Sequence, residues 1–249
     1  AQIISLIFVA VGLMGYLNVF RPWMSTDNKP IILFDFDGTI MDTEPCIKAT
    51  VVEVFKKYKP DYKLSDEELH AFIGPTLNDS FSKHFPSDLV DEVIEYYRDI
   101  NQKLHPEYVK PMPYAIEVLD RLKEEGYRMG IVSNKIVKAM QWPLDEYNMH
   151  HYFEVVLGYG DFDFVKPHPA GIDKALEEMN VGRDQLIYVG DQWSDIEAGA
   201  RAGAFTIAYN FDNISNEDIL NGKPNRAIDD LRVILDILKE EHEWTRTMM

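Results

Sequence analysis

The chain has 249 residues, a formal net charge of −17 at pH 7 and an apolar fraction of 46%. This length allows one domain of ordinary size with a smaller inserted one. The negative charge disfavours nucleic acid and anionic lipid headgroups as partners, so an anionic ligand would need local positive charge or a metal ion. The single cysteine, Cys46, excludes an intramolecular disulfide and a multi-cysteine zinc site. We expect Cys46 to be a packing residue in a cytoplasmic, reducing environment.

Residues 1–24 form an apolar segment for which two interpretations stay open. Residues 1–20 carry no charge and approach the ~20 apolar residues that span a bilayer, so they could tether the protein to a membrane. Alternatively, Met24 is the true start and residues 1–23 are spurious upstream translation. A signal peptide is disfavoured, because neither a basic stretch nor a small-residue cleavage pattern is present. Neither interpretation affects the chemistry below.

Five short apolar runs, rich in β-branched or aromatic residues, are predicted to be buried strands. They are residues 31–34, 129–132, 155–157, 186–189 and 205–209. Helix-length patterns lie between the later runs, for example at 115–125, where Gly126 ends the pattern. This alternation predicts an α/β fold, in which helices cover both faces of a parallel sheet.

About ninety residues separate the first two strands, far more than one crossover needs. Residues 44–110 show helical periodicity and predict an inserted all-helical domain, with 25–43 and 111–249 forming the core domain. We expect Pro45 and the prolines at 111–113 to mark its boundaries, because proline breaks helices and stiffens hinges. Residues 231–238 predict an amphipathic terminal helix. Small residues at 198–204 should let a helix pack closely on the sheet, and the histidines at 150–151 should lie in a surface turn.

Polar residues follow three of the predicted strands. Asp35 follows the first, Ser133 and Asn134 follow the second, and Asp191 follows the fourth. Because the carboxyl ends of strands in an open parallel sheet form the ligand crevice, we expect these residues to converge. Any one of them alone would read as a turn residue or helix cap.

The acidic residues in this group suggest phosphoryl transfer assisted by a metal ion. Asp35 and Asp37 could supply a nucleophile and a proton donor, if the chain turns at Gly38 so that both face one site. Gathering Asp35, Asp37, Asp191 and Asp195 at one cavity would cause strong repulsion without a cation. Mg²⁺ prefers such oxygen ligands. Lys166 would add a fixed positive charge.

These residues resemble the four ordered motifs of the haloacid dehalogenase superfamily. The motifs are DFDGT at 35–39, Ser133, Lys166 and GDQWSD at 190–195, and the match spans about residues 30–238. The resemblance is to subclass I phosphatases of the phosphoglycolate phosphatase type, and it implies a Rossmann-like core with a helical type I cap at 44–110.

The resemblance also implies a role for each residue. Asp35 would attack phosphorus, and Asp37 would protonate the leaving alcohol and then activate water. Ser133 would hold a phosphoryl oxygen and Lys166 would orient the nucleophile. The resemblance places Mg²⁺ between the Asp35 carboxylate, the Asp37 carbonyl and Asp191, with Asp195 behind them. The substrate-binding set is Thr39, Ser133, Asn134 and Lys166.

Asp37 narrows the expected reaction. Dehalogenases and phosphonatases resemble this scaffold but lack an acid two residues after the nucleophile, so hydrolysis of phosphate esters is favoured. Residues 72–77 (FIGPTL) resemble the substrate loop of phosphoglycolate-phosphatase-like members, although a simple helix-breaking turn is the alternative. We therefore expect magnesium-dependent hydrolysis of a small phosphorylated metabolite. A nucleoside-monophosphate phosphatase, a sugar phosphomutase and a catalytically silent binding module are the alternatives.

Overall fold

The computed structural model describes residues 29–183, 186–210 and 224–248. The two interpretations of residues 1–24 lie outside the described residues. Within the described ranges, no helix is long and apolar enough to cross a membrane.

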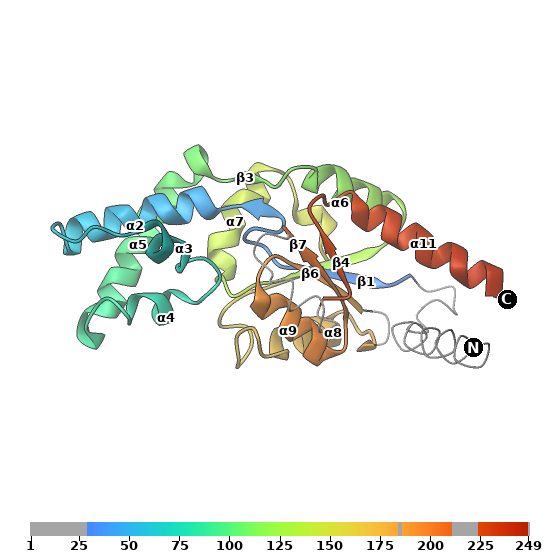
Figure 1. The fold of residues 1–249 in the computed structure, drawn as a ribbon. Helices are drawn as coiled ribbons and strands as arrows, with labels where there is room; N and C mark the ends of the chain where they lie inside the picture. The colour runs from blue at the N-terminus through green and yellow to red at the C-terminus, as the bar shows by residue number, and fades with distance from the viewer. Residues whose placement is uncertain (1–28, 184–185, 211–223, 249) are drawn as a thin grey trace, which may run out of the picture.

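A six-stranded parallel sheet forms the core, with strand order β5-β4-β1-β6-β7-β8 (Figure 1). The strands are β1 (Ile31–Phe34), β4 (Arg128–Val132), β5 (Val155–Leu157), β6 (Leu186–Gly190), β7 (Phe205–Tyr209) and β8 (Arg226–Ile228). All five predicted strands are confirmed, within one residue at each end. β8 was not predicted, because its three residues include a charged one and form no apolar run.

Helices cover both faces of this sheet, as predicted (Figure 1). They are α6 (Ala115–Glu124), α7 (Val137–Glu146), α8 (Ala170–Glu178), α9 (Trp193–Ala202) and α11 (Val233–Met248). Ile32 and Phe34 face one apolar core with α6, α7 and α11, whereas Ile31 and Leu33 face a second core with α8 and α9. Successive residues of a strand point to opposite faces, so β1 is buried on both sides.

Several smaller predictions are confirmed. A Cβ at Gly199 would lie 2.7 Å from the Thr206 side chain, so the small residues of α9 do allow close packing on the sheet. The adjacent histidines lie exposed in the short 3₁₀ helix η2 (His150–Tyr152). Cys46 is buried, and burial raises the pKa of its thiol to about 11, as suits a packing residue.

The insert between β1 and β4 is built from helices and has its own apolar core. The helices are α2 (Glu44–Tyr58), α3 (Asp66–His70), α4 (Leu77–Phe81) and α5 (Ser87–Tyr108). Val51, Val54, Phe81 and Val93 are among the fully buried residues of this core. Figure 1 shows these helices at one end of the sheet. We call α2–α5 the insert.

Two short strands connect the insert to the sheet domain. β2 (Met41–Asp42) and β3 (Lys110–Pro111) pair in antiparallel fashion and bring both crossings together. Pro45 lies within the first turn of α2, where a missing N–H costs no helical hydrogen bond. The paired crossings therefore lie next to Pro45 on one side and include Pro111 on the other.

Candidate active site

The carboxyl ends of three neighbouring strands bring the predicted polar residues together. Phe34 of β1 pairs with Ile131 of β4 and with Val189 of β6, so the three strands end at the same level. Asp35, Ser133 and Asp191 follow these ends and are all buried. The Asp35 amide also donates to the Val189 carbonyl at 2.8 Å, which extends the ladder to the carboxylate-bearing residue. Topology alone thus assembles residues far apart in sequence.

Lys166 is the buried cation at the centre of the site. It lies in the loop after β5, and its Nζ donates to Asp35 Oδ1 at 2.6 Å and to Asp195 Oδ1 at 2.5 Å. Burial alone would lower the pKa of Lys166, but Asp195 and Asp35 raise it well above its ordinary value. The side chain is therefore a permanent ammonium group that holds Asp35 in place.

A tight turn after Asp35 depends on Gly38. Its φ of 75° is in the left-handed region that favours glycine. A Cβ at this position would lie 2.3 Å from Asp191 Oδ2, so the turn packs directly on that carboxylate. Thr39 follows and is fully buried; its hydroxyl donates to Asp191 Oδ1 at 3.2 Å. The structure thus gives Thr39 a contact that orients Asp191, and it does not place Thr39 on the cavity wall.

Asp37 lies within this turn and pairs with a lysine that sequence reasoning missed. Its Oδ1 accepts from the Thr43 hydroxyl at 2.6 Å and from Lys135 Nζ at 3.0 Å. Lys135 lies two residues after Ser133 and is largely buried by these contacts. Its only sequence signal was this position at a strand end, which is also where a solvated loop lysine would lie.

Three buried carboxylates gather around Lys166, and their oxygens fit a hard divalent cation. One oxygen each from Asp35, Asp191 and Asp195 lie within 4.8 Å of one another. Burial raises the pKa of Asp35 to about 7, although Lys166 acts to lower it. Burial, together with the charges of Asp195 and Asp35, raises the pKa of Asp191. The single buried ammonium leaves negative charge uncompensated, which an Mg²⁺ ion would offset.

The three acids are not equally free to bind a metal ion. Asp195 Oδ1 accepts a hydrogen bond from Lys166 Nζ, and its Oδ2 accepts one from the backbone amide of Gln192 at 2.9 Å. Asp35 has one oxygen engaged by Lys166, and Asp191 is oriented by Thr39 and Gln192. Both Asp191 oxygens thus accept hydrogen bonds, as both Asp195 oxygens do, but the donors to Asp191 are neutral whereas Asp195 already faces the Lys166 cation. Asp35 and Asp191 are therefore the better candidates for direct ligands.

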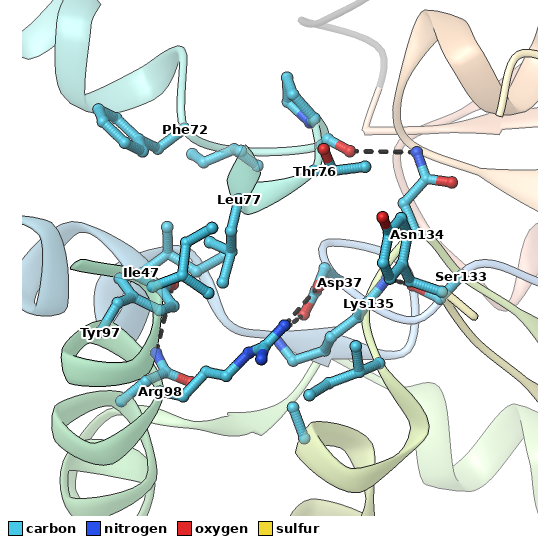
Figure 2. A pocket seen from close by; sticks show the side chains of 18 of the residues that line it. Asp37, Ile47, Phe72, Thr76, Leu77, Tyr97, Arg98, Ser133, Asn134 and Lys135 are labelled. Carbon is cyan, nitrogen blue, oxygen red and sulfur yellow. Dashed lines mark hydrogen bonds and ion pairs between the residues drawn. The ribbon is translucent and has the colours of Figure 1, made fainter. Parts of the chain in front are cut away.

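A cavity of about 670 Å³ joins this cluster to the insert. Asp35, Asp37, Ser133, Asn134 and Lys166 line it, as does the whole predicted loop at residues 72–77. Figure 2 shows Thr76 and Leu77 across the cavity from Asp37 and Ser133.

Asn134 connects that loop to Lys166. Its Oδ1 accepts from the Lys166 amide at 2.9 Å, and its Nδ2 donates to the Gly74 carbonyl at 3.4 Å (Figure 2). The loop therefore closes over the carboxylate cluster, as a substrate loop would.

Comparison with known proteins agrees with this geometry. The family model of haloacid dehalogenase-like hydrolases matches residues 32–209. Pyrophosphatase PpaX of Bacillus cereus (strain Q1) is 32% identical over 209 residues, covering 84% of this chain and 96% of that protein.

Two crystal structures share the fold. A putative haloacid dehalogenase-like hydrolase from Bacteroides fragilis has a TM-score of 0.75 at 23% identity, over 82% of this chain and 98% of its own. A predicted phosphoglycolate phosphatase from Haemophilus somnus has a TM-score of 0.73 at 24% identity, over 84% and 97%. The chain belongs to the haloacid dehalogenase-like hydrolases.

Proposed function

We propose that the chain is a magnesium-dependent phosphatase that hydrolyses small phosphate compounds through an aspartyl-phosphate on Asp35. One observation carries this proposal. The Asp35 carboxylate lies on the cavity wall, held by Lys166, and a second acid, Asp37, lines the same cavity. This is the pair of groups that a covalent route to phosphate release requires.

The first half-reaction would transfer the phosphoryl group to the protein. An Asp35 carboxylate oxygen attacks phosphorus while the bond from phosphorus to the leaving oxygen breaks. Asp37 donates a proton to that oxygen. Ser133 and Lys166 donate hydrogen bonds to the phosphoryl oxygens and so hold phosphorus in line with Asp35.

The second half-reaction would regenerate the carboxylate. Asp37, now deprotonated, takes a proton from water, whose oxygen attacks phosphorus and releases inorganic phosphate and free Asp35. A bound Mg²⁺, held by Asp35, Asp191 and the Asp37 carbonyl, would neutralise part of the phosphoryl charge. The insert would exclude bulk water during both steps.

Two substrates are favoured. Phosphoglycolate follows from the resemblance of the motifs and of residues 72–77. Inorganic pyrophosphate is the second candidate, because a pyrophosphatase shares 32% identity over nearly its whole length. Nucleoside monophosphates and phosphomutase chemistry remain predictions from the sequence, as does the cytoplasmic location. A silent binding module is disfavoured, since Asp35, Asp37 and Lys166 all line the cavity.

Phosphate release by the purified full chain tests the proposal. We expect release from phosphoglycolate or pyrophosphate that needs Mg²⁺ and stops when a chelator is added. Asp35→Asn should lower kcat by several orders of magnitude, because it removes the nucleophile. Asp88→Asn, at an exposed position of α5, is the matched control and should retain activity. Phosphate release by Asp35→Asn at the wild-type rate would refute the mechanism.

A further inference from the structure

The cavity extends well past the carboxylate cluster, along one face of α5. Ile94, Arg98, Asn101 and His105 line it at spacings of three and four residues, which places them on one side of the helix. Lys138 and Trp142 of α7 line the opposite wall. The volume of about 670 Å³ is in the range of complete small-molecule pockets, so a phosphoryl group alone would leave much of it unfilled. This outer part is where a leaving group would lie.

Arg98 is the unusual residue in the outer part. It makes no hydrogen bond or ion pair with any described residue, although Glu95 lies one turn before it on α5. The neighbouring acid, Asp99, pairs with Lys103 at 2.6 Å. Figure 2 shows the Arg98 side chain reaching from α5 into the cavity, toward the pair formed by Asp37 and Lys135. Its planar fork of N–H donors matches a carboxylate or a phosphate.

A second cation without a partner lies on the facing wall. Lys138, in the first turn of α7, also makes no ion pair with the part of the chain that the structure describes. Together with Lys135, these side chains bring positive charge from both walls to the outer cavity. Three acids of α5 also line the cavity: Asp91 and Glu95 lie farther toward the start of the helix, and Asp99, next to Arg98, is paired with Lys103. Local cations are what an anionic ligand needs on a chain with a net charge of −17.

We infer that the leaving group of the substrate carries a second anionic group, a carboxylate or a phosphate, and that Arg98 and Lys138 bind it. This inference rests on the proposed phosphatase function and names the substrate class. It makes Arg98 and Lys138 specificity-determining residues, distinct from the residues that touch the transferred phosphoryl group.

Pairs of substrates that differ only in the second anion test the inference. A series of ω-carboxyalkyl phosphates, starting from 2-phosphoglycolate, is compared with ω-hydroxyalkyl phosphates of the same length. Alkanediol bisphosphates, compared with the ω-hydroxyalkyl phosphates of the same length, form the phosphate arm. We expect the anionic member to have a kcat/KM about tenfold to a hundredfold higher at one chain length, from one or two charge-assisted hydrogen bonds.

Variants then assign the preference to residues. Arg98→Gln and Lys138→Gln should each reduce the preference, mainly by raising KM for the anionic member, and Arg98→Lys should keep part of it. Lys103→Gln is the matched control, because Lys103 is a cation of the same helix that pairs with Asp99 and does not line the cavity. It should keep the wild-type preference.

The outcomes separate this inference from the proposed function. Equal hydrolysis of the members of every pair, or a preference that survives Arg98→Gln with Lys138→Gln, would overturn the inference and leave a phosphatase. If no ester or pyrophosphate is hydrolysed, the proposed function fails, and calorimetric titration with the same pairs decides the inference. Tighter binding of the anionic member that Arg98→Gln abolishes would support it, and equal affinities would overturn it.

Discussion

Gly38→Ala should disturb the active-site turn in two ways, through backbone strain and through steric overlap with Asp191. Comparison with alanine at a second glycine, Gly126, separates the two effects. Gly38 has a φ of 75°, and a Cβ there would lie 2.3 Å from Asp191 Oδ2 and 2.6 Å from its Cγ. Gly126, which follows α6 at an exposed position, has a φ of 76°, and a Cβ there would meet nothing within 4 Å. Gly126→Ala therefore reports the backbone cost alone.

The structure allows the two costs to be estimated. A left-handed backbone costs a residue with a Cβ roughly 1–2 kcal/mol, and this applies equally at both positions. At Gly38 the Asp191 carboxylate must also move, which weakens its bonds from Thr39 at 3.2 Å and Gln192 at 2.9 Å. Hydrogen bonds to a charged group contribute about 1.5–3 kcal/mol each, so Gly38→Ala should lower the free energy of unfolding by about 2–4 kcal/mol more than Gly126→Ala.

Urea denaturation measures the free energy of unfolding of each variant. The dependence of kcat/KM on Mg²⁺ concentration measures the effect on the active site. We expect Gly38→Ala to need more Mg²⁺ and to lose most activity, because Asp191 is displaced from its place beside Asp35. Gly126→Ala should keep the wild-type Mg²⁺ dependence. Equal destabilisation by the two changes, with wild-type activity in Gly38→Ala, would refute the close packing of the turn on Asp191.

Two further predictions concern buried titratable groups. Burial lowers the pKa of His105 from 6.5 to about 4, so between these pH values the unfolded chain binds a proton that the folded chain does not. Stability should fall by about 3 kcal/mol as pH drops through this window, at 1.36 kcal/mol per pKa unit, and denaturation of His105→Gln should lack this part of the slope. An identical slope in wild type and variant would contradict this. Lys166→Met leaves Asp35 and Asp195 without their cation and should cost about 3–5 kcal/mol of unfolding free energy without Mg²⁺. Adding Asp195→Asn should recover part of that loss, and purely additive costs would argue against the ion pair.

The fold could be predicted wherever a local pattern was strong. The five predicted strands are apolar runs bounded by turn residues, and the helical insert has clear periodicity. β2, β3 and β8 could not be predicted, because each short strand includes a charged residue, forms no apolar run and exists only through its pairing partner. Pairing of this kind depends on tertiary contacts and leaves no periodic signal.

Site residues could likewise be predicted where a strand end positions them, and not where tertiary packing does. Asp35, Ser133 and Asp191 could be placed together because parallel strands end at one edge. Lys135 and Arg98 could not, because a lone cation in a loop or on a helix ordinarily faces solvent. Their place on the cavity wall depends on how α5 lies against α7, which no local pattern encodes. Thr39 was expected to bind substrate, and its contact with Asp191 depends on the turn at Gly38.

Chemical trapping of the intermediate tests the central claim most directly. The chain is quenched in acid during turnover with Mg²⁺ and substrate, reduced with borohydride, and mapped by peptide mass spectrometry. A phosphorylated Asp35 should be reduced at that side chain alone, and the signal should disappear in the absence of substrate. Steady phosphate release with an unmodified Asp35, or with reduction at Asp37 in its place, would contradict the assignment of the nucleophile.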